Sequence, residues 1–534
     1  MNLKRADIFS PLGIVLVVVN LIVFNLWMSK VFGRLDLTET RIYTLSDITK
    51  KVLRDLDEPL TVKAFFTKDL PAPYNNISRY VEDQLAEMKA YGGNNFRYEF
   101  LDPGGDEALK KEAEKYRLEP MQVNEMRADK MEFKLVYLGM ALIFEDKQEV
   151  IPAIQPDALG SLEYEVVSKI KRITSSETQS IGFVEGHEEP ILREQLKGLD
   201  RELRKMYDLK PVNFTSRATV PEGIDVLCLI GPKADLPERD KFAIDQFLMR
   251  GGRMFLALNA VETDISQMSA QKSKLRLGPW LANYGIKINE DLVMDRRAPT
   301  LPFQTMTRYG QQITMVVYPL FPEVITFAKD IIAMQSLRQV RLYFPTTVDT
   351  TLAAGMDSVK VSVLLYSSDK STIQSAPYDI NPLQQRGRYT WDQARLPLGM
   401  VVQGKFDSYW KDKEIPVDTE GVKVSDEEII PHSLDTRIVV IPDANFIQDQ
   451  FLVPGLDNLT MTLNLVDWLM QDEDLIKIRS REVGSRPIGE VSDAVRRMIK
   501  YINLIIPPLI VIIFGLIRWQ IRRARKVRTD ILKG

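Results

Sequence analysis

Few side chains in this sequence have the chemistry for acid–base catalysis, and the most suggestive is a histidine beside two glutamates. His187 stands in the segment Gly186-His187-Glu188-Glu189, directly after an apolar run that predicts a β-strand. An imidazole acts as a general base when a second group orients the ring and a nucleophile lies within hydrogen-bond reach. The neighbouring glutamates, or Asp443 further along the chain, supply the orienting group, but no nucleophile can be identified. The sequence therefore predicts no catalytic residue, and we expect His187 to act through binding or folding.

The single cysteine lacks the sequence context of a catalytic nucleophile. Cys228 lies inside the apolar run Val226–Ile230, and no turn signal follows it directly, although a nucleophile on a strand-to-helix turn requires one. We interpret it as a buried structural thiol. One cysteine excludes an intrachain disulfide, and together with only two histidines it excludes a multi-thiolate zinc site. No metal site is predicted.

The sequence also lacks the signature of a nucleotide-hydrolysing site. No G-x-x-x-x-G-K-[ST] motif occurs, so the chain cannot act as its own ATPase by that route. The pair Gly251-Gly252 falls at the predicted end of a helix, whereas phosphate sites use helix starts. We predict no cofactor, and a partner must supply the energy for any transport.

Several polar residues are expected to meet at one edge of a parallel sheet. In open α/β sheets, ligands collect outside the carboxyl ends of the strands. The candidate ligand-binding residues that follow predicted strands there are Gly186, His187, Glu188, Glu189, Asn259, Asp443 and Asn445. As a group they have the chemistry to hydrogen-bond a glycan or a peptide. The alternative is that they are ordinary caps of strand-to-helix turns, and the sequence leaves both interpretations open.

Length and charge limit the class of protein. A chain of 534 residues exceeds what one hydrophobic core supports, so two or three domains are expected. The net charge of −3 argues against a nucleic-acid partner, because a polyanion needs a basic stripe and the only dense basic run lies at the extreme C-terminus.

Two uncharged apolar segments predict transmembrane helices near the two ends of the chain. Residues 8–28 carry no charge over a length that crosses the hydrocarbon core of a bilayer. A cleaved signal peptide is the alternative, but the apolar run is long and no small-x-small site follows it. The uncharged run Tyr501–Ile517, between Lys500 and Arg518, predicts a second helix over residues 499–518, which Pro507-Pro508 should kink. A buried core helix is the alternative for this second segment.

Basic residues beside these segments predict their orientation. Lys and Arg near a membrane segment are retained on the cytoplasmic side. Lys4 and Arg5 precede the first segment, and the basic tail 519–534 follows the second. We therefore expect a two-pass protein of the bacterial inner (cytoplasmic) membrane, with lipid around both helices. Both termini are predicted to be cytoplasmic, and the bulk of the chain is predicted to be periplasmic.

Residues 34–175 show the element order of a thioredoxin-like α/β domain. After an opening helix with Ser46 as its N-cap, the predicted elements are a strand at Leu60–Phe66, a helix at Ile77–Tyr91, a strand at Phe96–Leu101, a helix at Asp106–Tyr116, strands at Lys134–Phe144 and Glu149–Ile154, and a helix at Leu162–Ile173. This region contains no cysteine, so the Cys-x-x-Cys pair that redox chemistry requires is missing. Only the scaffold is expected.

Residues 178–480 alternate between strands and helices, which predicts a doubly wound parallel sheet of the Rossmann-like or flavodoxin-like kind. The predicted strands are Ser180–Val184, Val226–Ile230, Arg253–Leu258 and Arg437–Ile441, and the predicted helices are Leu192–Met206, Glu238–Met249 and Leu459–Met470. The alternation stops between about residues 274 and 434. We interpret this stretch as a large insertion in the second domain.

Segments in a fixed order carry a family resemblance. They include RLDLTETRIYTLSDITKKVL after the first anchor, GFVEGHEEP, LGPWLANYGIKINEDLVMD, LGMVVQGKFDSYW and RIVVIPDANF. In these segments the chain resembles the gliding-motility-type auxiliary component of ABC transporters. The family pattern at the histidine is close to Gly-His-Gly-Glu, so Glu188 stands where a small residue is expected. The segment Asp443–Phe446 keeps the first and last members of a pattern similar to Asp-Ser-x-Phe but lacks the hydroxyl.

The resemblance implies a subunit that sits beside a separate permease and ATPase, and it implies no chemistry. The leading hypothesis is therefore a non-catalytic auxiliary or substrate-binding subunit of an ABC-type transporter with a large extracytoplasmic region. An envelope hydrolase or amidotransferase-like enzyme is one alternative. A membrane scaffold without a ligand of its own is the other.

Overall fold

The computed structural model describes residues 44–479, apart from gaps at 69, 71–73, 128–129, 176–178, 215–218, 308–309, 383–389 and 418–428, and a few isolated residues nearer the two ends. The chain divides into two units, residues 1–482 and 483–534. The two predicted transmembrane segments and the basic tail fall almost wholly outside the described residues. Among the helices that are described, none combines the length and the apolar character needed to cross a bilayer.

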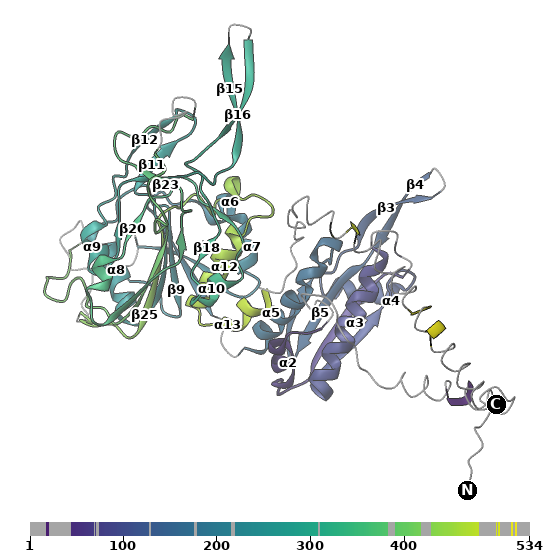
Figure 1. Ribbon diagram of the computed structural model, residues 1–534. Coiled ribbons are helices and arrows are strands. Elements are labelled where there is room, and N and C mark those ends of the chain that lie inside the picture. The colour runs from purple at the N-terminus through teal and green to yellow at the C-terminus, as the bar shows by residue number, and fades with distance from the viewer. Residues whose placement is uncertain are drawn as a thin grey trace, which may run out of the picture. The chain divides into compact units, whose positions relative to one another are not determined.

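The N-terminal part of the chain forms a four-stranded sheet with helices packed on it (Figure 1). The strands lie in the order β2 (Phe96–Leu101), β1 (Leu60–Phe66), β5 (Leu138–Phe144) and β6 (Lys147–Ile151). Strand β1 runs parallel to β2 and antiparallel to β5, and β5 runs antiparallel to β6. The helices are α2 (Asp47–Arg54), α3 (Asn75–Gly92), α4 (Glu107–Lys115) and α5 (Leu162–Thr174).

Local sequence explains most of these elements. The hydroxyl of Ser46 accepts a hydrogen bond from the N–H of Thr49, which caps α2 as predicted. Helix α3 buries Ile77, Val81 and Leu85, which recur every four residues and so share one face. The predicted bounds of β1 and β2 match the structure.

One prediction in this region is wrong. The expected strand Lys134–Phe144 is two strands, because the chain bends at Tyr137, whose N–H donates to the Thr67 hydroxyl and whose carbonyl accepts from the Thr67 N–H. The first part belongs to β4 (Lys130–Val136), which forms a separate antiparallel hairpin with β3 (Met121–Arg127). Strand β3 was not predicted, since its sequence MQVNEMR holds few apolar residues.

The rest of the large unit is built on a seven-stranded sheet that is mostly parallel. Its strand order is β21 (Val359–Val363), β24 (Met400–Gly404), β25 (Thr436–Ile441), β10 (Arg253–Ala257), β9 (Val226–Ile230), β7 (Ser180–Glu185) and β8 (Asp208–Asn213). The five strands from β25 to β8 are parallel, and β24 runs antiparallel to both of its neighbours. If the five parallel strands are numbered 1 to 5 along the chain, their order across the sheet from β8 to β25 is 2-1-3-4-5. The crossover connections therefore change direction between β7 and β9.

Helices cover both faces of this sheet, because alternate residues of its strands are apolar on both sides. In β9, Val226, Cys228 and Ile230 face a core that also contains residues of α7 (Lys197–Leu203) and α12 (Asn458–Leu469). Leu227 and Leu229 face the opposite core, beneath α8 (Glu238–Met249). Figure 1 shows α8 and α12 on opposite sides of the strands. The α/β class and the parallel character of the sheet are confirmed.

Two further predictions need correction. The expected helix Leu192–Met206 is broken into α6 (Leu192–Gln195) and α7, and the next strand, β8, was not predicted. Strand β8 contains Pro211, which an edge strand tolerates but which weakens the sequence signal. The stretch 274–434 is also more than an insertion, since β21 and β24 extend the sheet beyond β25.

The remaining elements between β10 and β25 are short. They are β11 (Val261–Asp264), β12 (Ser269–Lys272), α9 (Gly278–Ala282), β13 (Lys287–Ile288), β14 (Leu292–Asp295), β17 (Glu323–Val324), β18 (Thr326–Phe327), α10 (Ile332–Gln335), β19 (Val340–Arg341), β20 (Val348–Asp349), α11 (Thr351–Ala354), β22 (Leu365–Tyr366) and β23 (Ser371–Gln374). They position the loops around the carboxyl edge of the large sheet.

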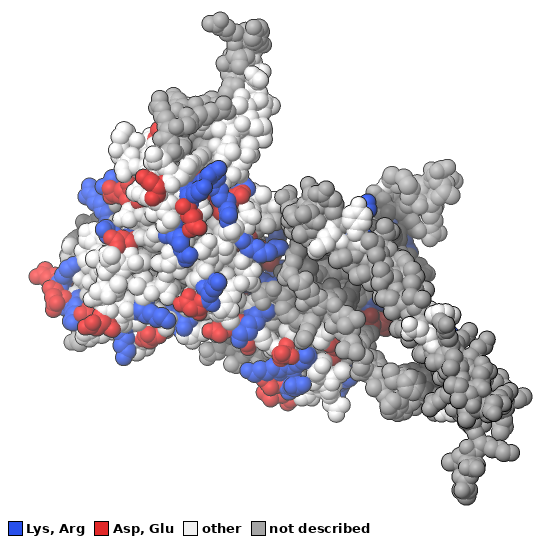
Figure 2. Space-filling model, in the orientation of Figure 1, with Lys and Arg blue, Asp and Glu red and all other residues white. Residues whose placement is uncertain are grey.

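A long hairpin projects from this segment (Figure 1). It consists of β15 (Thr300–Thr307) and β16 (Gly310–Val317), which pair only with each other among the described strands. Ile313, Met315 and Val317 alternate along β16 and are 65%, 59% and 49% exposed. Figure 2 shows no acidic or basic side chain on the described part of the hairpin, in contrast to the mixed charges of the body below it. The hairpin therefore presents an uncharged apolar stripe to its surroundings.

The last described helix of the large unit ties two parts of the fold together. Helix α13 (Glu473–Arg479) contacts α12 and α5. Arg479 is buried, with Nη2 lying 2.8 Å from Asp467 Oδ2 on α12 and donating to the hydroxyl of Tyr164 on α5. Just before α13, Asp472 accepts from Lys171 Nζ of α5 at 2.5 Å. The Arg479–Tyr164 hydrogen bond and the Lys171–Asp472 ion pair join the helix layer of the four-stranded sheet to that of the seven-stranded sheet.

Candidate functional site

The loops that follow β7, β9 and β25 pack tightly at the carboxyl edge of the large sheet. Gly231, just after β9, has φ +57° and donates its N–H to the carbonyl of Ala257 at 2.8 Å. A Cβ built on Gly231 would lie 3.0 Å from Cβ of Ala444 and 3.4 Å from Cδ of Pro190. Ala444 follows β25 and Pro190 follows β7, so protein atoms from three loops fill this part of the edge.

His187 is held between two carboxylates. Its Nδ1 lies 2.9 Å from Glu189 Oε1, and its Nε2 lies 2.8 Å from Asp240 Oδ2 on the first turn of α8. The histidine is 5% exposed, and the side chains of Glu189 and Asp240 are 4% and 11% exposed. Both ring nitrogens therefore have protein partners, and neither is available to a substrate.

The charge of this cluster follows from its geometry. Burial lowers the pKa of His187, but the hydrogen bonds and charges of Asp240 and Glu189 outweigh that effect and raise the pKa to about 9. At neutral pH the ring is an imidazolium that donates from both nitrogens to carboxylates. A protonated ring cannot accept a proton, so this geometry is that of a structural ion cluster.

The backbone of the histidine loop is also fixed. The His187 N–H donates to Glu189 Oε2 at 2.7 Å, and its carbonyl accepts from Lys233 and Ala234 at 2.9 and 3.0 Å. Glu188 is exposed and has φ +64°, a left-handed conformation that favours glycine. The Gly-His-Gly-Glu pattern of the resembling family thus has glycine where this backbone favours one. Gly186 has φ +119° and is exposed beside Asn213.

Asp443 braces a different loop. It is fully buried, and its two carboxylate oxygens accept the N–H of Tyr343 at 2.6 Å and the N–H of Asn445 at 2.8 Å. Burial raises the pKa of Asp443 to about 7, although the backbone hydrogen bonds oppose the increase. The carboxyl therefore fixes the segment before β20 against the end of β25.

The two amide residues of the predicted site have similar local roles. Asn259 Oδ1 accepts from the N–H of Ala444 at 2.8 Å, which links the loops after β10 and β25. Asn445 Nδ2 donates to the carbonyl of Tyr343 at 3.4 Å. Both residues are half-buried.

The structure thus places all seven predicted residues at the carboxyl edge, but in two groups. One surrounds His187, and the other surrounds Asp443 with Asn259 and Asn445. No hydrogen bond or ion pair joins the groups within the described residues. Asp240 and Tyr343 are central to these groups and were not predicted. They lie 53 and 100 residues from their partners, and no local pattern marks them.

The other candidate groups are inert. Cys228 is 2% exposed inside β9, and burial raises the pKa of its thiol well above the ordinary range. In the described part of the chain, no three His, Cys, Asp or Glu side chains converge as metal ligands would.

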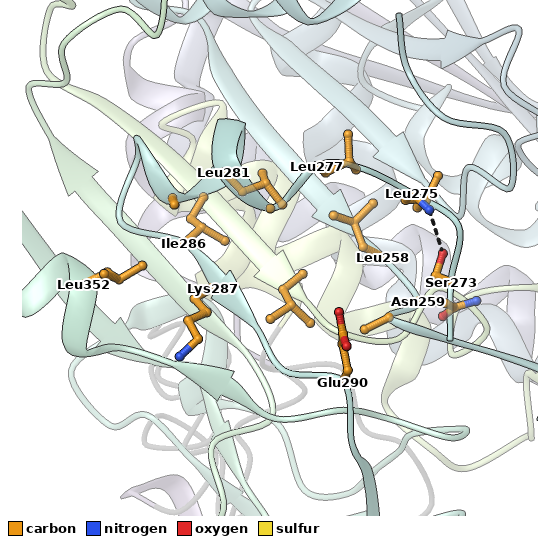
Figure 3. Close-up of a pocket in the computed structure, with 14 residues that line it drawn as sticks. Leu258, Asn259, Ser273, Leu275, Leu277, Leu281, Ile286, Lys287, Glu290 and Leu352 are labelled. Atoms are coloured by element: carbon orange, nitrogen blue, oxygen red, sulfur yellow. Dashed lines mark hydrogen bonds between the residues drawn. The ribbon is translucent and has the colours of Figure 1, made fainter. Parts of the chain in front are cut away.

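A cavity of about 330 Å³ lies beyond the carboxyl end of β10 (Figure 3). Asn259 is one of its lining residues, beside Leu258 at the end of the strand. The opposite walls come from α9, β13 and Leu352 of α11. The cavity and the packed loops beside it lie at the carboxyl edge of a mostly parallel α/β sheet.

Comparison with known proteins places the chain in a family. It belongs to the family described as ABC-type uncharacterized transport system, whose model matches residues 178–471, more than half of the chain. A second model, a domain of unknown function (DUF7088), matches residues 39–143. The transport-family part of the sequence resemblance is confirmed, whereas these matches do not speak of gliding motility.

Individual relatives are distant. An uncharacterized protein of Borreliella burgdorferi is 22% identical over 513 residues, covering 92% of this chain and 93% of its own length. Among solved structures, the mmIFT52 N-terminal domain is 14% identical with a TM-score of 0.33, covering 58% of this chain and 100% of its own. The exo-beta-1,4-mannosidase Op5Man5 of an Opitutaceae bacterium is 9% identical with a TM-score of 0.20, covering 79% of this chain and 52% of its own. Scores this low do not define a shared fold.

Proposed function

We propose that this chain is a non-catalytic auxiliary subunit of an ABC-type transporter, which binds a separate permease and ATPase. It carries a large extracytoplasmic region between two terminal membrane helices, and both termini lie in the cytoplasm. Membership of the transport family supports the transport role. The absence of a Walker motif from the sequence makes a separate ATPase necessary.

The contacts and the raised pKa of His187 support the non-catalytic part of this proposal. Its two ring nitrogens contact Glu189 and Asp240, and its pKa is raised to about 9. A hydrolase or amidotransferase-like site would need an accessible base next to a nucleophile on a strand-to-helix turn. The polar groups at this edge instead brace the loops. We infer that they position a binding surface.

The β15–β16 hairpin supports the subunit part of the proposal. An isolated two-stranded hairpin is marginally stable in water, and exposed apolar strands promote association. The stripe formed by Ile313, Met315 and Val317 is therefore suited to contact another protein. We propose that it docks on a partner subunit of the transporter.

The two sheets have complementary roles in this proposal. The four-stranded sheet has the strand order and directions of a thioredoxin-like scaffold, without the cysteines that redox chemistry needs. The seven-stranded sheet supplies the binding edge. Of the candidate residues there, the exposed Glu188 is the one we retain as a contact for a glycan or peptide ligand.

Co-purification tests the proposal. Full-length protein extracted in mild detergent from its native cells should bring down a permease and an ATPase. The variant Met315→Glu places a charge in the apolar stripe and should reduce recovery of both partners severalfold. The matched control is Ile325→Glu, which changes an exposed residue (48%) outside the hairpin and should leave recovery unchanged. Absence of both partners from the wild-type eluate would reject the subunit role.

A further inference from the structure

The cavity beyond β10 has walls suited to an aliphatic group. Four of its lining residues are buried hydrophobic side chains, namely Leu258, Leu277, Leu281 and Ile286. Leu275 and Ile288 are partly buried and complete the interior, while Leu352 is 40% exposed. In Figure 3 the side chains of Leu258, Leu281, Ile286 and Leu352 lie around one space. The apolar lining means that an apolar ligand group gains free energy on entering.

The volume limits the size of that group. At about 330 Å³ the cavity is at the small end of ligand pockets in proteins. A cavity of this size suits an aliphatic chain of medium length.

The charged groups at the cavity balance one another. Lys287 lines the cavity and its Nζ lies 2.8 Å from Asp349 Oδ2. Glu290 also lines it, and its Oε1 lies 2.6 Å from Nζ of Lys272. Each charged residue of the cavity lining is therefore paired with an opposite charge from outside the lining. This arrangement offers no excess charge to offset the desolvation of an ionised ligand.

Two uncharged donors are available beside the apolar walls. Asn259 uses its Oδ1 to hold Ala444, and its Nδ2 has no protein acceptor among the described residues. Ser273 Oγ accepts from the N–H of Leu275 at 3.4 Å, which leaves the hydroxyl hydrogen free to donate. Both residues line the cavity. Two donors of this kind suit a neutral acceptor such as an ester or amide carbonyl.

We propose that this cavity binds an uncharged amphiphile that consists of a medium-length aliphatic chain and an ester- or amide-type head. The chain lies among Leu258, Leu277 and Leu281, and the carbonyl accepts hydrogen bonds from Asn259 and Ser273. This site goes beyond the proposed function, because ligand binding here does not require the permease or the ATPase to be present.

The test is calorimetric titration of the full-length protein, held in an amphipathic polymer so that no detergent competes. Monodecanoylglycerol is the probe and should bind saturably at one site per chain. Decanoate has the same chain with a charged head, and monobutyrylglycerol has the same head with a short chain. Both should bind at least tenfold more weakly. Failure of monodecanoylglycerol to saturate, or equal affinity for decanoate, would overturn the proposal.

Variants locate the site. A Cβ added at Gly278, which lines the cavity, meets no atom within 4 Å, so Gly278→Leu should fill the space without disturbing the fold. It should weaken monodecanoylglycerol binding at least tenfold. The matched control is Gly105→Leu, at a glycine that is equally open but lies in the four-stranded-sheet region and should bind as wild type. Ser273→Ala should weaken binding about two- to tenfold, as expected for one neutral hydrogen bond.

A further variant keeps the test decisive if Gly278→Leu fails to fold. Leu352 is partly exposed, so Leu352→Ser is expected to fold and to weaken binding severalfold. Unchanged affinity in both Leu352→Ser and Ser273→Ala would place the ligand elsewhere. Co-purification with transporter subunits is a separate measurement, so failure of this site and failure of the proposed function are distinguishable.

Discussion

Replacement of His187 by alanine tests whether the cluster at the sheet edge is structural. The substitution leaves the carboxylates of Glu189 and Asp240 buried and facing each other without the cation between them. Breaking a buried ion pair by removing one partner costs about 3–5 kcal/mol. We therefore expect His187→Ala to lower the free energy of unfolding by that amount at pH 7, with loss of assembly following from loss of fold.

The pH dependence of unfolding gives a second, independent value for the contribution of His187 to stability. The pKa of His187 rises from the ordinary 6.5 to about 9 on folding, so the folded state binds the proton more tightly. The contribution to stability is fully present below pH 6.5 and is lost as the pH rises through 9. At about 1.36 kcal/mol per pKa unit, it is of the order of 3 kcal/mol. The difference between wild type and His187→Ala should shrink by about this amount between pH 6 and pH 10.

The assay is denaturant-induced or thermal unfolding of wild type and variant at several pH values. Glu188→Asn is the matched control, because it removes a charge from the same loop at an exposed position and asparagine tolerates the left-handed backbone. It should change the free energy of unfolding by less than about 1 kcal/mol.

Two results would refute the reasoning. If His187→Ala unfolds like the Glu188→Asn control at every pH, then His187 does not stabilise the fold. If it is stable and assembles with the transporter but has no function at any expression level, then the imidazole has a direct chemical role. That second outcome would also argue against a non-catalytic subunit.

The remaining predictions concern other buried or terminal groups. Because the pKa of Asp443 is raised to about 7, the folded protein should lose stability as the pH rises from about 4 through 7, and Asp443→Asn should flatten this part of a pH–stability profile. Arg479→Met removes the cation from a buried ion pair and should cost about 3–5 kcal/mol in thermal unfolding; a shift below 1 kcal/mol would show the pair to be dispensable. The buried thiol of Cys228 should resist maleimide in the folded protein and react after denaturation, and rapid native labelling would contradict its burial. Since the buried Cys228 gives little background labelling, single added cysteines can test the membrane topology. Cysteines at the positions of Lys4 and Arg525 should be labelled from inside the cell, and a cysteine at the position of Lys274 should be labelled from outside. Protection of the Lys274 position until lysis would reverse the orientation.

Elements with strong local periodicity were predicted well from the sequence. Strand β9 and helix α8 have the predicted bounds, because an unbroken apolar run and a helix followed by two glycines are both local signals. Strand β3, its pairing with β4, and the edge strand β8 were missed. Their sequences are mostly polar or contain proline, and their pairing with a neighbouring strand leaves no local signal in the sequence.

The candidate site likewise has features that the sequence predicts and features that it does not. Topology places residues after parallel strands at one edge, so the position of His187 and Asp443 could be predicted from strand order alone. The hydrogen-bond partners of these two residues could not be predicted. Asp240 belongs to a helix after a different strand, and Tyr343 lies in the stretch taken as an insertion. Only the folded chain shows that these polar groups satisfy one another rather than a ligand.

The contacts of α13 have a mechanical consequence. The chain continues from Arg479 toward the C-terminal segment, and Arg479 is the last residue of the large unit that the structure describes. Arg479 contacts α12 through Asp467 and α5 through Tyr164, and Lys171 of α5 also contacts Asp472 just before α13. A pull that reaches Arg479 is therefore divided between two layers of the fold. Unwinding α13 from this residue requires withdrawal of a buried guanidinium, so both helix layers resist its displacement together.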